Sequence, residues 1–184
     1  MKRILLLTLL LVSSFGFGQE PVIEWQKSLG GSLTDIAWSI QQTTDGGYIL
    51  AGESDSSDGD VTGSNGSHDF WVVKIDSAGN ITWQKSLGGT ESDWAFSIQQ
   101  TTDGGYIVAG STESNDGDVT VLNGYRDYWV VKLDLSGNIT WQKSFGGSSG
   151  DMAFSVQQTT DAGYIVAGGS ASNNGDATEN YGMG

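Results

Sequence analysis

Cysteine is absent from the 184-residue sequence, and proline and histidine occur once each. Without cysteine the chain has no disulfides, thiolate metal sites, cysteine nucleophile or lipid-modified cysteine. The single histidine, His68, leaves little room for histidine-based catalysis. Basic residues are also scarce, since 8 Lys and Arg face 22 Asp and Glu and the formal charge is -14. A field of this sign repels phosphate backbones and anionic lipids, so we expect no nucleic-acid partner.

Glycine and aromatic residues are abundant instead. The sequence has 28 glycines and 10 % aromatic residues. No segment after the N-terminal region keeps a helical spacing of apolar residues, because glycine or a β-branched residue interrupts each candidate. This composition indicates an all-β protein whose strands are separated by glycine-containing turns.

Residues 1–18 have the features of a secretory signal peptide. A basic start at Lys2 and Arg3 precedes an apolar run of nine residues, and Gly16 and Gly18 supply small residues for cleavage. The run is far shorter than the roughly 20 residues that span a bilayer. The alternative is an N-terminal hydrophobic strand. We expect cleavage near Gly18, a secreted or cell-surface location, and no later membrane span.

The remaining residues, 19–184, repeat with a period of 58 residues. A WQKSLGG-type string opens each copy, and a QQTTDGGYI-type string follows it. A WVVKID-type string occurs in the first two copies and is missing from the third. We therefore expect that the chain is a piece of a longer reading frame with further repeats. The repeat units are residues 25–82, 83–140 and, truncated, 141–184.

Each unit has the pattern of four strands. Apolar and polar residues alternate before and after the turn at residues 44–47, which predicts a hairpin. The run from Phe70 to Ile75 is almost continuously apolar, as in a strand covered on both faces, and residues 77–80 form the turn into the next strand. A tandem four-stranded unit of this length predicts an all-β fold, a β-propeller fragment with two full blades and a truncated third.

The tryptophans are expected to form the packing between blades. All seven lie inside the repeats. Trp25, Trp83 and Trp141 occupy equivalent positions, and we interpret them as core residues between blades. Sugar-stacking platforms are the alternative.

The ordered set of motifs in the second unit resembles a known family. It consists of a glycine pair with Asp93-Trp94-Ala95, the Asp103-Gly104-Gly105 turn, the strand from Trp129 to Asp134, and a Gly-Asn turn. The set is similar to the seven-bladed β-propeller repeat of secreted and surface proteins of Bacteroidota, many of which carry a type IX secretion sorting domain. The resemblance covers essentially residues 24–184. It implies a fold and a compartment, because members mostly lack an assigned activity.

An acidic loop recurs in each unit, at residues 55–60, 113–118 and 171–176. Carboxylates in a glycine-containing loop are ligands that Ca²⁺ prefers, although the spacing departs from an EF-hand. The alternative is an Asx turn in which each carboxylate caps amides of its own loop. The candidate calcium ligands are Asp58, Asp60, Asp116, Asp118 and Asp176.

Other repeated carboxylates favour a structural role. Asp35, Asp93 and Asp151 each precede a strand, where paired carboxylates would suggest a glycosidase. A catalytic pair needs two different environments, whereas repeated residues are expected to share one. Asp45 and its two equivalents are assigned to the hairpin turn.

The positions that differ between copies are the candidate binding residues, because loops at the faces of a propeller commonly bind ligands. Ordinary drift in solvated loops is the alternative. The candidates are His68, Glu91, Leu122, Tyr125 and Arg126.

We predict a secreted, non-enzymatic binding or structural scaffold with no catalytic residues and an extracellular protein or glycan as partner. The alternative is part of a larger carbohydrate-active or other hydrolytic propeller whose catalytic residues lie in further blades. No cofactor other than the candidate calcium is expected.

Overall fold

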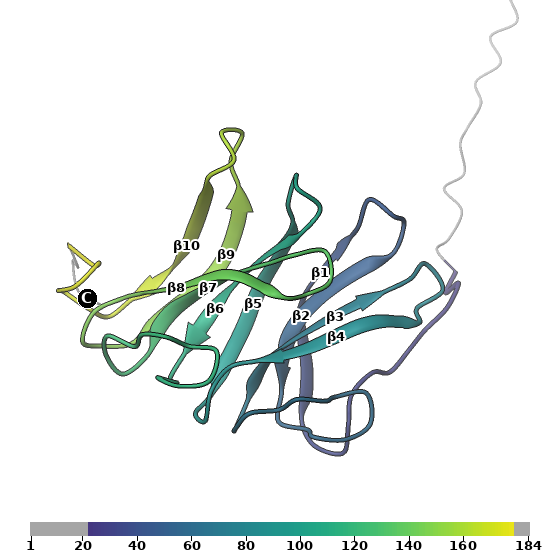
Figure 1. The fold of residues 1–184 in the computed structure, drawn as a ribbon, viewed down its shortest axis with the longest axis horizontal. Coiled ribbons are helices and arrows are strands. Elements are labelled where there is room, and N and C mark those ends of the chain that lie inside the picture. Colours follow the sequence, from purple (N-terminus) through teal and green to yellow (C-terminus); the bar gives the residue numbers. More distant parts are fainter. Residues whose placement is uncertain (1–21, 179–184) are drawn as a thin grey trace, which may run out of the picture.

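The computed structural model describes residues 22–178, and the signal peptide predicted at residues 1–18 lies outside them. The described chain consists of ten β-strands without a helix (Figure 1). Within this range, no segment meets the length and hydropathy required of a membrane-spanning helix. The strands are β1 (Asp35–Gln42), β2 (Tyr48–Ser54), β3 (Asp69–Ile75), β4 (Ile81–Leu87), β5 (Asp93–Gln100), β6 (Tyr106–Thr112), β7 (Asp127–Leu133), β8 (Ile139–Phe145), β9 (Asp151–Gln158) and β10 (Tyr164–Ser170).

The strands form three antiparallel sheets that lie side by side in chain order (Figure 1). The first sheet has the order β1-β2-β3-β4, the second β5-β6-β7-β8, and the third contains only β9 and β10. The all-β repeat with four strands per complete unit is thereby confirmed. The first sheet ends at Leu87, so the strand containing Trp83 belongs to it, although a count that starts at Trp25 puts Trp83 in the second unit.

The turn between the first two strands of each sheet is built by its aspartate. Asp45 Oδ1 accepts hydrogen bonds from the Thr43 hydroxyl and from the Gly47 amide at 3.0 Å. The buried ammonium of Lys74 lies 2.9 Å from Asp45 Oδ2. These contacts hold the pKa of Asp45 well below its ordinary value, the Thr43 hydrogen bond most strongly. The predicted turn role of Asp45, Asp103 and Asp161 is confirmed.

Apolar residues from facing sheets form a shared core. Between the first and second sheets, Phe70 packs on Trp129 with ring centroids 4.6 Å apart. Between the second and third sheets, Ile107 and Val130 pack with Val156. Every residue of β3 and β6 is buried, as predicted for strands covered on both faces. The continuous apolar runs follow from this arrangement, because neither face of these strands meets water.

Each outer face of the stack exposes an apolar residue whose equivalent in the second sheet is buried. Ile40 is 61 % exposed, whereas Ile98, its equivalent in the second sheet, is 5 % exposed. On the opposite face, Ile165 is 60 % exposed, whereas Ile107 is fully buried. Burial at these positions therefore depends on the neighbouring sheet, which covers Ile98 and Ile107 but is missing at Ile40 and Ile165.

The first strands of the three sheets are joined by side chains. Gln41 Oε1 accepts the amide of Gln100 at 2.6 Å, and Gln99 Oε1 accepts that of Gln158 at the same distance. The hydroxyl oxygens of Ser39 and Ser97, two residues before these glutamines, accept further amides from the neighbouring first strand. These side chains satisfy strand-edge N–H groups that would otherwise lack partners.

The opening tryptophans pack between sheets, as expected, but are not fully buried. Trp83 is partly buried against the first shared core, with its ring 5.7 Å from that of Tyr106. Trp25 and Trp141 make the same edge contact with the equivalent tyrosines but are 38 % and 37 % exposed. The expectation of buried core residues is therefore wrong for these two, because the sheets beside them are incomplete.

Candidate functional site

The carboxylates of the acidic loops accept hydrogen bonds from the glycine loops. We define the glycine loops as residues 30–34, 88–92 and 146–150. Asp60 Oδ2 accepts the Gly30 amide at 3.1 Å, and Asp58 Oδ1 accepts the Ser32 amide at 2.7 Å. In the second unit, Asp118 accepts the Gly88 amide and Asp116 accepts the Thr90 amide. In the third unit, Asp176 accepts the Gly146 amide. The carboxylates thus cap amides of a loop 26 or 30 residues away, not of their own loop as the Asx-turn interpretation supposed.

The predicted calcium ligands are therefore bound to backbone amides. Within residues 22–178, no three His, Asp or Glu side chains gather in an arrangement that would hold a metal ion. Ca²⁺ takes 6 to 8 oxygens, and each of these carboxylates already has an amide donor. Calcium binding at the acidic loops stays a prediction.

A second set of aspartates lies buried where neighbouring sheets meet. Asp93, at the start of β5, accepts the Gly89 amide and the Ser114 hydroxyl, both at 2.9 Å. Asp69, at the start of β3 in the preceding sheet, accepts the Asn65 amide at 2.7 Å through Oδ2, and its Oδ1 has no partner. Both side chains face Gly88, where a Cβ atom would lie within 2.5 Å of an oxygen of each.

The next junction repeats this pair with Asp127 and Asp151. Asp127 accepts the Asn123 amide at 2.6 Å through Oδ2, and its buried Oδ1 has no partner. Both carboxyl groups face Gly146. We name the two sets the aspartate junctions. Asp35 has the same kind of glycine amide and serine hydroxyl donors, but the atoms nearest a Cβ at Gly30 all belong to Asp35, without a second aspartate.

Burial raises the pKa of three of these carboxyl groups. Desolvation raises the pKa of Asp93 to about 6 against hydrogen bonds from Thr112, Gly89 and Ser114, and the charge of Asp69 adds to the increase. Burial likewise raises the pKa of Asp69 and of Asp127. Asp151 differs, because hydrogen bonds from Ser170, Gly147 and Ser172 outweigh its desolvation and lower its pKa. Equivalent aspartates therefore have different environments, contrary to the expectation from repetition.

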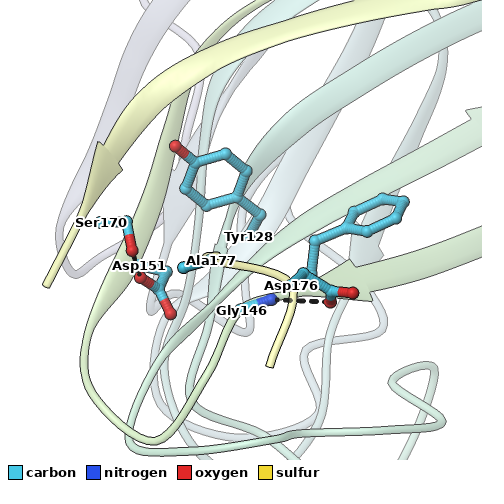
Figure 2. A pocket seen from close by; sticks show the side chains of 7 residues that line it. Tyr128, Gly146, Asp151, Ser170, Asp176 and Ala177 are labelled. Carbon is cyan, nitrogen blue, oxygen red and sulfur yellow. Dashed lines mark hydrogen bonds between the residues drawn. The ribbon is translucent and has the colours of Figure 1, made fainter. Parts of the chain in front are cut away.

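A pocket of about 170 Å³ explains part of this difference. Figure 2 shows Asp151 and Asp176 at its wall, with Tyr128 above them and Ala177 beside them. The equivalents of Tyr128 and Ala177 in the preceding junction are Phe70 and Val119, both buried in the core. The second junction is thus more open than the first.

Two of the predicted binding residues gather around Trp94. The Arg126 guanidinium carbon lies 4.3 Å from the centre of the Trp94 ring and 5.7 Å from that of Tyr125. Arg126 also forms an ion pair with Glu113, with Nε 2.9 Å from Oε1. The His68 ring stacks on Trp94 at a centroid distance of 6.2 Å. The stacking of His68 on Trp94 joins the first sheet to the second, whereas the cation–π contact of Arg126 lies within the second.

The remaining predicted residues are placed less closely. Tyr125 is 67 % exposed at the edge of this cluster. Glu91 is exposed in its glycine loop, where its amide donates to Ser114, and Leu122 is half-buried. Sequence reasoning missed Trp94 and Glu113 as cluster members. The available signal was the variation at position 94, which is isoleucine and methionine in the other copies.

Sequence reasoning also missed an aromatic strip, which consists of Trp38, Phe96 and Phe154. Each is the extra residue of a β-bulge at the same place in β1, β5 and β9. The rings follow one another at 6.0 and 5.6 Å, and Trp38 and Phe154 are 53 % and 51 % exposed. The bulge requires glycine opposite, since a Cβ at Gly52 would overlap the Ile36 carbonyl. Bulges commonly re-aim a side chain, here towards solvent.

No protein-family model matches the chain. Among curated proteins, it is similar to the regulatory protein FlaEY of Caulobacter vibrioides, with 27 % identity over 164 residues. That stretch covers 80 % of this chain and 17 % of FlaEY, so the chain spans a small part of the relative's length. The match shows distant homology to FlaEY.

Proposed function

We propose that the protein is a secreted, non-enzymatic scaffold of β-propeller type that binds an extracellular protein or glycan. The observation that carries this proposal is the shared core between facing sheets. Each four-stranded sheet has apolar residues on both faces, which a sheet on either side would cover. The positions of Ile40 and Ile165 are apolar although no sheet covers them. Further sheets of the same repeat fit both open faces.

The stack supports a radial arrangement. Among the first strands, β1 packs against β5 and β5 against β9, whereas no comparable packing joins β4 to β8 among the described residues. Sheets that converge at their first strands and diverge at their fourth are arranged like propeller blades.

Residues 25–29 support closure of a ring. The ring of Trp25 packs on Tyr48 as Trp83 packs on Tyr106, so this segment takes the position of a fourth strand beside the first sheet. It forms no strand within the described residues. Its sequence repeats that of β4 and β8, and the third sheet has no fourth strand among residues 22–178. A final blade would therefore combine C-terminal strands with residues 25–29.

The binding surface would combine the aromatic strip with the variable loops. Exposed aromatic rings give large contact area at low entropic cost, and the rigid strands fix their spacing. Within residues 22–178, the repeated carboxylates are engaged by amides or buried, which favours a scaffold over the hydrolytic alternative. Secretion and surface location rest on the N-terminal signal.

Insertion of extra sheets tests the architecture. Copies of residues 88–145, each one full period, would be inserted after Phe145 to give four to eight sheets. The proposal expects the melting temperature to rise with each copy, and one copy number to give a monodisperse monomer with a plateau in radius of gyration. Unlimited growth of the radius, or a melting temperature unchanged by added copies, would contradict it.

A glycan array tests the aromatic strip. Phe96→Ala removes the central ring, and Leu135→Ala removes an exposed apolar residue elsewhere, since Leu135 is 64 % exposed. Loss of glycan binding in the first variant with retention in the second supports the strip as the binding surface. Equal binding by both variants contradicts it.

A further inference from the structure

The aspartate junctions place two carboxyl groups together without a basic partner. In the first junction, Asp69 is 1 % and Asp93 0 % exposed, and both face Gly88. Asp69 Oδ1 is buried and accepts no hydrogen bond. Two buried carboxylates that both lie against Gly88 destabilise a folded chain strongly unless a positive charge joins them.

The groups around the first junction do not supply that charge. Asp118 caps Gly88 and adds a further negative charge near Asp69. The basic side chain that acts on Asp69 is His68, which stacks on Trp94 and lies 4.0 Å from Asp55. Its influence on Asp69 is smaller than that of burial.

The second junction has the same imbalance. Asp176 adds a negative charge near Asp127, and Tyr128 is the other titratable neighbour. Arg126 precedes Asp127 in the chain, but its guanidinium pairs with Glu113. Neither junction therefore holds an ammonium or guanidinium group against its two carboxyl groups.

We propose that each aspartate junction binds one proton between its two carboxyl groups, so that the contact between neighbouring sheets is strengthened by mild acid. The proton converts one carboxylate into a hydroxyl donor, which gives the unpartnered oxygen of Asp69 or Asp127 a hydrogen bond. At the first junction Asp69 and Asp93 share the proton. At the second junction Asp127 retains it, because Ser170, Gly147 and Ser172 stabilise the ionised form of Asp151.

A proton fits these sites better than a metal ion. Ca²⁺ needs 6 to 8 oxygens, and a junction offers two carboxyl groups of which each already accepts backbone amides. Within residues 22–178, no cluster of three metal-ligating side chains is present.

The sign of the pH effect follows from the raised pKa values. A carboxyl group whose pKa is higher in the folded chain than in the unfolded chain contributes stability below the unfolded pKa, and this stability is lost as pH rises through the folded pKa. For Asp93 this window runs from the ordinary pKa of 3.8 to the raised pKa of about 6. The melting temperature of the full chain should therefore fall by about 5 °C between pH 5 and pH 8.

Thermal unfolding of three chains tests the proposal. Asp93→Asn keeps the shape but cannot ionise, so it should lose the first junction's share of the decrease in melting temperature and retain only the share of the second junction. Asp35→Asn is the matched control, because it removes the same charge at a position without a facing aspartate, and it should retain the wild-type decrease. Asp69→Asn should behave like Asp93→Asn, which provides a second variant if one folds poorly.

Infrared spectroscopy gives a readout independent of variant stability. The wild type in deuterated buffer at pH 5 should show the carbonyl absorption of a protonated carboxylic acid, and this absorption should disappear by pH 8. Its absence at pH 5 would overturn the proposal. A melting temperature that rises at pH 8 on addition of calcium chloride and returns with chelator, in the wild type but not in Asp93→Asn, would also overturn it by identifying a metal site.

Discussion

The second and third sheets contain almost the same hairpin in different surroundings. β6 reads YIVAGST and is buried at every residue, whereas β10 reads YIVAGGS and is exposed except at the partly buried Tyr164 and Val166. β6 pairs with strands on both edges, and β10 pairs only with β9. Local sequence therefore determines the hairpin in this protein, while the neighbouring sheet determines its burial and with it the stabilising effect of each side chain.

The largest expected difference concerns one isoleucine. Ile107 is fully buried and Ile165 is 60 % exposed at the equivalent position. Ile107→Ala should lower the free energy of unfolding by about 3 kcal/mol, because it removes buried methyl groups and leaves a cavity. Ile165→Ala should cost less than about 1 kcal/mol. Urea unfolding of both variants measures the difference, and equal losses would show that the two hairpins are equally covered.

A smaller difference is expected at the hairpin turns. Asp103 pairs with the buried ammonium of Lys132 at 2.9 Å, which helps to lower the pKa of Asp103 to about 2 after the larger effect of Thr101. Asp161 makes the same turn contacts, but the third sheet has no strand equivalent to β7. Because Asp103 is largely exposed, Asp103→Asn should cost only about 1 to 2 kcal/mol, and Asp161→Asn should cost less than Asp103→Asn.

The Asp103 effect should depend on pH in a stated direction. Its pKa is lowered in the folded chain, so its contribution is present above the unfolded pKa and is lost as pH falls from 3.8 towards 2. The wild type and Asp103→Asn should converge in stability at the acid end of this window. A constant gap between them would show that the ionised carboxylate is not the stabilising group.

The smallest expected effect concerns one backbone angle. Ala162 has a φ of 65°, whereas Gly104 at the equivalent turn position has a φ of +85°. Ala162→Gly should raise the free energy of unfolding by about 1 kcal/mol, since glycine adopts this region without strain. The reciprocal Gly104→Ala should lower it by a similar amount. Chemical unfolding checks both, and a loss of stability in Ala162→Gly would contradict the account.

Much of the fold follows from the sequence because its signals are local. The alternation around residues 44–47 and the apolar run before Lys74 each specify a hairpin or a buried strand within a few residues. The two-sided burial was also predictable, since both faces of each strand agree between copies.

The candidate sites were less predictable because their contacts join distant parts of the chain. Asp58 is compatible with a local turn, yet its carboxylate caps Ser32, 26 residues earlier. Asp69 and Asp93 belong to different sheets, and only the stacking of those sheets brings them to Gly88. The bulge at Trp38 was hidden because apolar residues keep a period of two through it, at Ile36, Trp38 and Ile40.

Hydrogen exchange followed by mass spectrometry tests the central claim most directly, because peptides from β6 and β10 have nearly the same intrinsic exchange rates. The account predicts that amides of residues 106–112 exchange at least a hundredfold more slowly than those of residues 164–170, since β6 is covered and paired on both sides. Equal protection of the two strands would contradict the claim that neighbouring sheets, and not the repeat sequence itself, stabilise each unit.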